Sequence, residues 1–305
     1  MMKCSKCGSK AIYHQKYSGL YLCKECFIKD VERKVRKSLG KKIIKNNMKI
    51  GVGLSGGKDS VVMTYILNKF FETIPNSEIV VFFVDEGIKG FREVARKFVI
   101  EFCERYDIKY KIIPLKEELG ITLDDIVKIA REKNITLNPC SFCGVMRRKL
   151  LNKYALKEGC NYLAIGHNLD DISQAIMMNY IDGSIEKLVR LGKDAEHPLL
   201  VKRIRPLKYI PEEEVQLYAD LVGLKYQKEP CPYSSISYRA EISEIIDKLE
   251  DSHPGTRHSI VSGFEKLIKH LDIKMEVKTC KICGEPSSGD ICKVCLWMEK
   301  LGLRV

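Results

Sequence analysis

The sequence has no apolar run near the roughly 20 residues that a membrane-spanning helix needs, and Met1-Met2-Lys3-Cys4 does not resemble the start of a secretory signal. It also has no long low-complexity segment. We therefore expect a globular, cytoplasmic protein with no membrane partner, and the hydrophobic content of 45% agrees with that class. A chain of 305 residues can form one α/β domain of roughly 200 residues with small appended modules.

Acidic residues are scarce at the start of the chain. Residues 1–50 hold fourteen Lys and Arg against three Asp and Glu, a net charge of +11, whereas the whole chain carries +12. Such a local excess favours a polyanionic partner such as RNA. The basic run 33–37, taken by itself, fits a solvated helix face equally well.

Cysteine, in contrast, is abundant, with thirteen residues. Because disulfides are rare in the cytoplasm, metal binding or catalysis is the expected use. Eight of the cysteines form C-x2-C pairs that combine into two groups of four, a spacing typical of structural zinc sites. We therefore predict two Zn²⁺ ions, one in a zinc ribbon at each end of the chain. Their ligands would be Cys4, Cys7, Cys23 and Cys26 in the first ribbon and Cys280, Cys283, Cys292 and Cys295 in the second.

Residues 49–60, KIGVGLSGGKDS, predict a strand, a glycine-rich turn and the start of a helix. At such a junction the unpaired backbone N–H groups and the positive end of the helix dipole form an anion site. This is not the common mononucleotide loop, because Val52 and Asp59 stand where that motif needs Gly and Ser or Thr. The residues expected to hold phosphate are Gly53, Leu54, Ser55, Gly56, Gly57, Lys58, Asp59 and Ser60.

Beyond this loop, predicted strands and helices alternate, which is typical of a doubly wound, mostly parallel α/β sheet. Ligands of such sheets bind at the carboxyl ends of the strands, so the loop, Asp85 and the segment 166–171 should meet at one rim. Asp59 and Asp85 are candidates for Mg²⁺, which prefers carboxylate oxygens. Strands are expected at 49–54, 78–84, 109–114 and 162–165, and helices at 58–73, 90–106, 143–158, up to 181, 211–222 and twice within 238–271.

These patterns divide the chain into a central domain with appended modules at both ends. The fold class predicted is α/β, flanked by the two zinc ribbons. The predicted limits are a zinc ribbon at 1–30, a basic linker helix at 31–47, an α/β domain at 48–230, a helical extension at 231–274 and a zinc ribbon at 275–305.

Five cysteines remain outside the zinc groups. Cys103 and Cys160 lie in apolar contexts and are expected to be buried. Cys140 and Cys143 stand in a turn marked by Pro and Gly, just before a predicted helix whose N-terminus should lower their pKa values. Cys231 lies between two prolines, where a stiff backbone can hold its side chain in a fixed direction.

Together these motifs resemble the tRNA 2-thiouridine synthetases, a group within the N-type ATP pyrophosphatases, or PP-loop proteins. The resemblance rests on SGG-x-DS at 55–60, C-x-x-C before a basic helix, G-H-N-L-D-D at 166–171, a later P-C-P and the two ribbons. It covers the whole chain and narrows to the branch found in archaea, the eukaryotic cytosol and thermophilic bacteria. It implies an adenine-nucleotide α-hydrolase-like fold, a homodimer and tRNA as the substrate.

The resemblance also implies a reaction, in which ATP adenylates the uridine C2 oxygen, releases pyrophosphate, and sulfur then replaces that oxygen. Cys140, Cys143 and Cys231 match the ligands of a [4Fe–4S] cluster whose fourth iron would hold an exogenous sulfide. Arg147 and Asp171 match catalytic positions, but Arg147 departs from the lysine of some relatives and cannot accept a proton. Lys58 and Asp59 complete the implied catalytic set, and Asp85, Arg147, Gly166 and Asp171 are the further residues assigned to ATP.

Other interpretations remain open. The same adenylation could be followed by persulfide chemistry at Cys143 or Cys231, without a cluster. The three central cysteines could instead form a third zinc site with His167. A PP-loop ligase that does not thiolate, or an RNA-binding protein with a relic nucleotide site, would keep the loop without needing these cysteines. The sequence names neither the target uridine (wobble or T-loop) nor the sulfur donor, which is free sulfide or a ubiquitin-like thiocarboxylate carrier.

Overall fold

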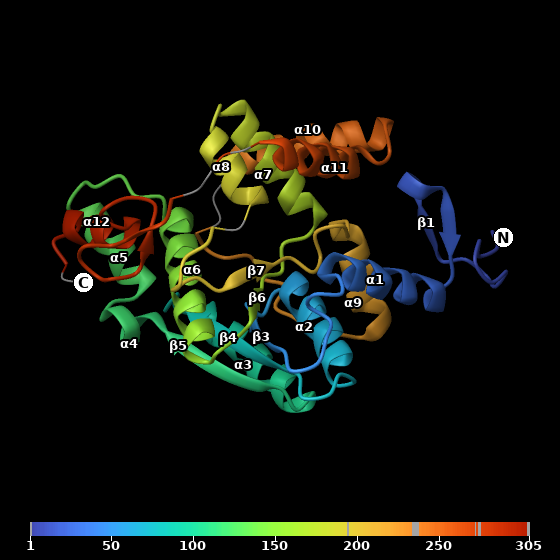
Figure 1. Cartoon of the computed structure of the whole chain (residues 1–305), viewed down its shortest axis with the longest axis horizontal. Helices are drawn as coiled ribbons and strands as arrows, with labels where there is room; N and C mark the ends of the chain where they lie inside the picture. The colour runs from blue at the N-terminus through green and yellow to red at the C-terminus, as the bar shows by residue number, and fades with distance from the viewer. Residues whose placement is uncertain (1, 194, 234–237, 272, 274–275, 304–305) are drawn as a thin grey trace.

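The computed structural model describes residues 2–193, 195–233, 238–271, 273 and 276–303. A five-stranded sheet with its helices forms the middle of the molecule (Figure 1). The N-terminal module, drawn in blue, and the C-terminal module, drawn in red, lie on opposite sides of this domain in that view. Among the described helices, none is long and apolar enough to cross a membrane.

The central sheet consists of β3 (Lys49–Gly53), β4 (Glu78–Asp85), β5 (Lys109–Pro114), β6 (Tyr162–Ala164) and β7 (Lys202–Ile204). All five are parallel, in the order β5-β4-β3-β6-β7, which confirms the predicted sheet. The chain moves outward from β3 to β5 and then returns to the other side of β3. Ligands of doubly wound sheets bind at this reversal, which here lies between β3 and β6.

Most of the expected helices occur within a few residues of their predicted bounds. Four helices, α4, α5, α8 and α12, were not predicted, although α5 begins with a recognisable capping box between Thr122 and Asp125. The described helices are α1 (Lys24–Leu39), α2 (Lys58–Phe71), α3 (Arg92–Arg105), α4 (Leu115–Leu119), α5 (Leu123–Glu132), α6 (Pro139–Lys157), α7 (Leu169–Ile181), α8 (Ile185–Gly192), α9 (Glu212–Val222), α10 (Tyr238–Ser252), α11 (Thr256–His270) and α12 (Lys293–Lys300).

The sheet separates two apolar cores, because alternate side chains of a strand point to opposite faces. On β4, Val81 and Phe83 pack into a core with residues of α1, α2, α3 and α9. Phe82 and Val84 pack into the other core, with residues of α5, α6 and α12. Both faces of the sheet are therefore covered, as a parallel sheet requires.

The start of α6 differs from the prediction in a way that matters for function. The helix was expected to begin after Cys143, but it begins at Pro139 and contains both central cysteines. Asn138 is the N-cap residue, and its side chain accepts the N–H of Ser141 at 3.0 Å. Proline suits the first helical position because its missing N–H has no partner there.

Helix α1 is part of the core of the central domain rather than a linker. It begins directly after Cys23, inside the N-terminal ribbon, and ends at Leu39, well before the predicted limit of 47. Val31 and Val35 are completely buried in the core that covers β3 and β4. Its apolar face therefore contributes to the stability of the α/β domain itself.

Each terminal module is a small antiparallel hairpin attached to a different helix. The N-terminal hairpin pairs β1 (Tyr13–Gln15) with β2 (Leu20–Leu22), and Gln15 donates to the buried Glu214 of α9 at 2.8 Å. A 3₁₀ turn, Lys16–Ser18, joins its two strands. The C-terminal hairpin pairs β8 (Lys278–Thr279) with β9 (Pro286–Ser287), and the module packs on α6, where Trp297 and Phe142 have ring centroids 5.1 Å apart.

Candidate active site

The phosphate loop connects β3 to α2 and is closed by its own side chains. Ser60 Oγ accepts the N–H of Ser55 at 3.1 Å and donates to the Gly57 carbonyl at 2.8 Å. Gly56 has φ of +90°, and a Cβ there would lie 3.3 Å from Ala95 of α3. Both the backbone conformation and the close approach of α3 therefore require glycine.

A cavity of about 270 Å³ lies beside this loop, at the reversal of the sheet. Phe82, Val84 and Leu151 give it an apolar wall that suits a purine ring, whereas the loop offers backbone N–H groups to phosphate. The residues assigned to ATP or catalysis that line this cavity are Gly53, Leu54, Ser55, Gly57, Asp59, Ser60, Arg147 and Gly166. The other assigned residues do not line it: Gly56, Lys58, Asp85, Cys140, Cys143, Asp171 and Cys231.

Two of the candidate carboxylates are joined through Asn168. Its side-chain amide donates to Asp59 at 3.0 Å, and its side-chain oxygen accepts the N–H of Asp171 at 2.9 Å. The Asp171 carboxylate accepts the N–H of Asn168 in return, which closes a capping box at the start of α7. Burial raises the pKa values of both Asp59 and Asp171, because desolvation disfavours the charged form of each carboxylate.

The other two charged candidates have partners of their own. Lys58 Nζ lies 2.8 Å from a carboxylate oxygen of Glu212, at the start of α9. Asp85 accepts the N–H of Gly87 at 3.0 Å, directly after β4. Both residues stand at the rim of the sheet, where the sequence pattern predicts them.

The three central cysteines come from two segments that lie against each other. Cys140 and Cys143 are three residues apart in α6 and therefore share one face of the helix. Cys140 Sγ donates to the Tyr233 carbonyl at 3.2 Å, which brings the segment of Cys231 against α6. Cys143 and Cys231 also belong to the same apolar cluster. The donor set is three thiols in one neighbourhood, as a cluster with three protein ligands requires.

The expected lowering of thiol pKa by the helix N-terminus is wrong for Cys143. Burial, together with the neighbouring Glu86 carboxylate, raises the pKa of Cys143 to about 12. The reason is position: Cys143 is the fifth residue of α6, and the dipole effect is confined to the first turn. The thiol is therefore protonated in the metal-free protein and would release its proton on binding iron.

Glu86 and Arg92 are site residues that the sequence motifs did not predict. Glu86 follows β4 directly and is 1% exposed, yet its carboxylate contacts Arg92 at 2.6 Å and Arg147 at 3.2 Å. Although burial acts in the other direction, the Glu86 charge raises the pKa of Arg147. The available signal was the position of Glu86 beside Asp85 at the carboxyl end of a buried strand.

Within the described residues, two groups of cysteines could hold a single metal ion, and they are the two predicted groups of four. Cys7 and Cys23 have sulfurs 3.5 Å apart, and Cys292 and Cys295 have sulfurs 3.4 Å apart. Sulfurs at 2.3 Å from a tetrahedral zinc ion are separated by about 3.8 Å, so both groups fit zinc.

A third zinc site formed by the central cysteines and His167 is absent from the described part of the chain. Cys140, Cys143 and Cys231 do not gather as the two groups of four do. His167 instead lines the cavity beside the phosphate loop, where burial and the positive charge of Arg205 lower its pKa to about 4.

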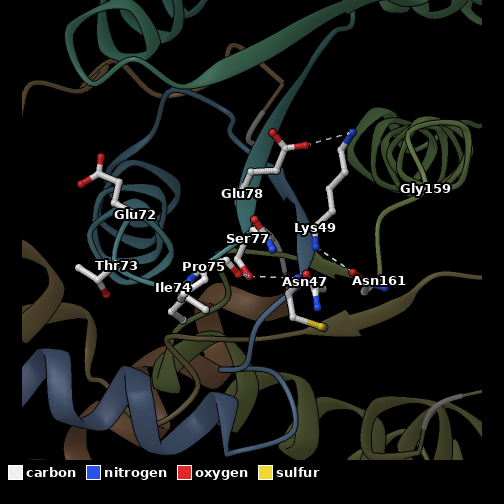
Figure 2. A pocket seen from close by; sticks show the side chains of 12 residues that line it. Asn47, Lys49, Glu72, Thr73, Ile74, Pro75, Ser77, Glu78, Gly159 and Asn161 are labelled. Atoms are coloured by element: carbon white, nitrogen blue, oxygen red, sulfur yellow. Dashed lines mark hydrogen bonds and ion pairs between the residues drawn. The ribbon is translucent and has the colours of Figure 1, made fainter.

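A larger cavity, of about 880 Å³, lies at the opposite edge of the sheet (Figure 2). It surrounds the amino ends of β3 and β4, where Lys49 forms an ion pair with Glu78 at 3.4 Å and its N–H donates to Asn161 at 2.8 Å. None of the predicted site residues lines it. We therefore exclude it from the candidate active site despite its size.

Comparison with known proteins shows the family to which the chain belongs. The PP-loop domain family matches residues 28–249, and the N-terminal LIM domain of 2-thiouridine synthetase TtuA matches residues 3–28. A "Probable sulfurtransferase" of Methanocaldococcus jannaschii is 58% identical over 99% of this chain and 88% of its own length. The "tRNA-5-methyluridine(54) 2-sulfurtransferase" of Pyrococcus horikoshii is 34% identical over 96% of this chain and 93% of its own length.

A solved structure, "U34-tRNA thiolase NcsA from Methanococcus maripaludis with its [4Fe-4S] cluster", is 53% identical to this chain. The two superpose with a TM-score of 0.90 and cover 100% of this chain and 98% of that one. Similarity of this extent, in sequence and in fold, confirms the resemblance drawn from the motifs. The chain belongs to the PP-loop family and, within it, to the 2-thiouridine synthetases that act as tRNA sulfurtransferases.

Proposed function

We propose that this protein uses ATP to convert a uridine of tRNA to 2-thiouridine. One observation carries the proposal: the phosphate loop and α6 line the same cavity, and α6 reaches it through Gly144, the residue that follows Cys143, and through Arg147. A uridine bound there would meet ATP at a wall of the cavity formed by the helix that holds Cys140 and Cys143. A PP-loop ligase that does not transfer sulfur would have no use for thiols beside its nucleotide site.

In the first step, the uridine C2 oxygen attacks the α-phosphorus of ATP, the α–β phosphate bond breaks, and pyrophosphate leaves with the bonding electrons. The phosphate loop would hold the phosphates, and Lys58, released from Glu212, would neutralise the charge that develops on pyrophosphate. Arg147 is permanently charged and would hold phosphate rather than act as a base. Asp59, Asp85 and Asp171 would bind Mg²⁺ or orient the reacting groups.

In the second step, sulfur adds to C2 and AMP leaves. Cys140, Cys143 and Cys231 would hold a [4Fe–4S] cluster through three thiolates. Such a cluster leaves one iron free to bind exogenous sulfide. Because two cysteines suffice for persulfide chemistry, the presence of three favours the cluster.

The two terminal modules would each hold one zinc ion in a structural role, because four cysteine ligands leave no open coordination position. Two names among the relatives point to different uridines. The protein that shares 53% identity is named for U34 and the one that shares 34% for position 54, so we propose the wobble uridine. We also propose a cytoplasmic homodimer supplied with sulfide or by a thiocarboxylate carrier.

The test is thiolation of unmodified tRNA by anaerobically reconstituted protein, with ATP and sulfide. We expect 2-thiouridine at position 34 by nucleoside mass analysis, stoichiometric pyrophosphate and about four irons per chain. Asp59→Ala should abolish both products and keep the iron. Cys231→Ala should lose the iron and the thiolated product.

Three results would contradict parts of this proposal. Thiolation by wild type that never takes up iron would exclude the cluster as the carrier of sulfur. A fully active Cys231→Ala variant would remove that residue from the site. Pyrophosphate release without thiolation, in protein that holds four irons, would favour a different PP-loop reaction.

A further inference from the structure

Glu86 joins three groups that the proposed reaction uses or depends on. Its carboxylate contacts Arg92 Nε at 2.6 Å and Arg147 Nε at 3.2 Å, and Cys143 Sγ lies 3.5 Å from its Oε1. A buried carboxylate is tolerated only when it is paired, and two guanidinium groups provide that pairing. These contacts hold the Glu86 carboxylate between β4 and α6, the helix that contains Cys140 and Cys143.

Arg92 extends this contact to the phosphate loop. It is 5% exposed, donates to the Ser55 carbonyl at 3.2 Å and to the Val84 carbonyl at 2.5 Å, and lies over the ring of Phe83. A guanidinium fork fixed by three partners holds its position more firmly than a single ion pair does. Arg92 thus forms a rigid bridge from the loop that would bind ATP to the carboxylate beside Cys143.

Arg147, which also contacts Glu86, lines the cavity and remains partly exposed to solvent. Its side chain is 42% exposed, but its Nε is anchored on Glu86, which is itself buried. Without that anchor, a long side chain of this exposure would sample several rotamers. The carboxylate therefore determines where the Arg147 charge stands relative to the loop and to the cysteines.

We propose that Glu86 is a positioning residue: it fixes Arg147 in the active site and, through Arg92, holds the cysteine helix in register with the phosphate loop. The inference deepens the proposed function and rests on it. A positioning role for Glu86 predicts two effects that a purely structural ion pair would not have. The rate of sulfur transfer would depend on the placement of Arg147, and the potential of the cluster would depend on the Glu86 charge.

Two substitutions at Glu86 separate the effect of its charge from the effect of its position, and a substitution at Glu214 provides the control. Glu86→Gln keeps the size and removes the charge, whereas Glu86→Asp keeps the charge and shortens the reach. Glu214→Gln removes another buried carboxylate, one that pairs with Lys34 at the N-terminal module. Each reconstituted protein is measured for iron per chain, ATP affinity, single-turnover thiolation rate and midpoint potential.

We expect Glu86→Gln to keep wild-type iron content and to thiolate roughly 10- to 100-fold more slowly. Its midpoint potential should become more positive, because losing a buried negative charge favours the reduced cluster. Glu86→Asp should also be slow but keep a potential near that of wild type. Glu214→Gln should lower only the melting temperature.

Wild-type rate and potential in Glu86→Gln would overturn the inference. An equal loss of rate in Glu214→Gln would also overturn it, since the effect would then be general destabilisation. If wild type holds no iron, the cluster part of the proposed function fails on its own. The thiolation rates still decide the role of Glu86 in that case, and an unchanged rate would refute it.

Discussion

At the scale of single residues, a buried charge is stable in this molecule because oppositely charged side chains surround it. Asp30 of α1 is 2% exposed and lies within 3.0 Å of Lys6, Arg33 and Lys34. Part of the basic excess at the start of the chain is thus neutralised inside the structure rather than offered to a ligand. A charge count from sequence cannot show this, because it does not show which charges pair.

This cluster predicts a distinctive pH dependence. Although burial acts in the other direction, Arg33, Lys6 and Lys34 hold the pKa of Asp30 far below its ordinary value. Its stabilising effect is therefore complete above the unfolded-state pKa of about 3.9 and is lost as the pH falls towards the folded-state pKa. Asp30→Asn should cost about 3 kcal/mol in urea unfolding, equally from pH 5 to pH 8, and less below about pH 4.

The control is Glu93→Gln, which removes an exposed carboxylate on α3 and should change the free energy of unfolding by less than about 0.5 kcal/mol. A difference between wild type and Asp30→Asn that grows or shrinks between pH 5 and pH 8 would show that another group titrates there.

Gly166 gives a second prediction at this scale. A Cβ on this residue would lie 3.1 Å from the Ser60 nitrogen, so the loop after β6 touches the start of α2 directly. Gly166→Ala should push the two apart and weaken ATP binding by roughly tenfold, as measured by calorimetry. Gly263→Ala, at an exposed helical position with open space around it, should leave ATP affinity unchanged and stabilise α11 by about 0.5–1 kcal/mol. Unchanged ATP affinity in Gly166→Ala would refute the contact.

At the scale of elements, the two terminal modules are attached to different parts of the α/β domain. The N-terminal module contacts α9 through the buried Glu214, whereas the C-terminal module contacts α6, the helix of Cys140 and Cys143. Lys149 of α6 also donates to Cys283 at 3.3 Å. If the C-terminal module holds the proposed zinc ion, its loss should disturb the packing of α6 before that of the other helices.

The single tryptophan of the chain, Trp297, allows this to be measured. Cys283→Ser should remove one ligand of the proposed zinc site, shift the Trp297 emission to longer wavelength and lower the melting temperature, because zinc contributes on the order of 10 kcal/mol to such modules. Cys7→Ser, in the other module, should leave the Trp297 spectrum unchanged. A Cys283→Ser protein with wild-type melting temperature but no thiolation would instead make the module catalytic.

At the scale of the whole molecule, much of the architecture could be predicted because it follows from local patterns. Alternating strands and helices predicted the parallel sheet, and spacing predicted both groups of four cysteines. The start of α6 was missed although Asn138 and Pro139 form a recognisable N-cap and first position. Glu86 and Arg92 were missed for a deeper reason: their pairing joins the ends of different elements, which no local pattern describes.

The burial of α1 changes how RNA binding should be tested. Removing residues 1–45 would be the direct experiment on the basic segment, but Val31 and Val35 are buried in the main core, so the deletion would unfold the domain. We instead predict that the exposed residues Arg36, Lys37 and Lys41 contact tRNA phosphates.

Changing Arg36, Lys37 and Lys41 to Gln should make the negative slope of log affinity against log salt shallower. The expected change is roughly 0.7–0.9 for each phosphate that the protein no longer neutralises, while ATP affinity stays unchanged. The control is a matched triple change of three exposed lysines of β5, α5 and α8, namely Lys109, Lys128 and Lys187. It is needed because any positive charge on the surface attracts the polyanionic tRNA to some extent. The measurement is fluorescence anisotropy of labelled tRNA across a salt series from about 50 to about 300 mM. If the slope becomes shallower by the same amount in both triple variants, the overall positive charge of the protein accounts for tRNA binding. If it changes in neither, the tRNA binds on another surface.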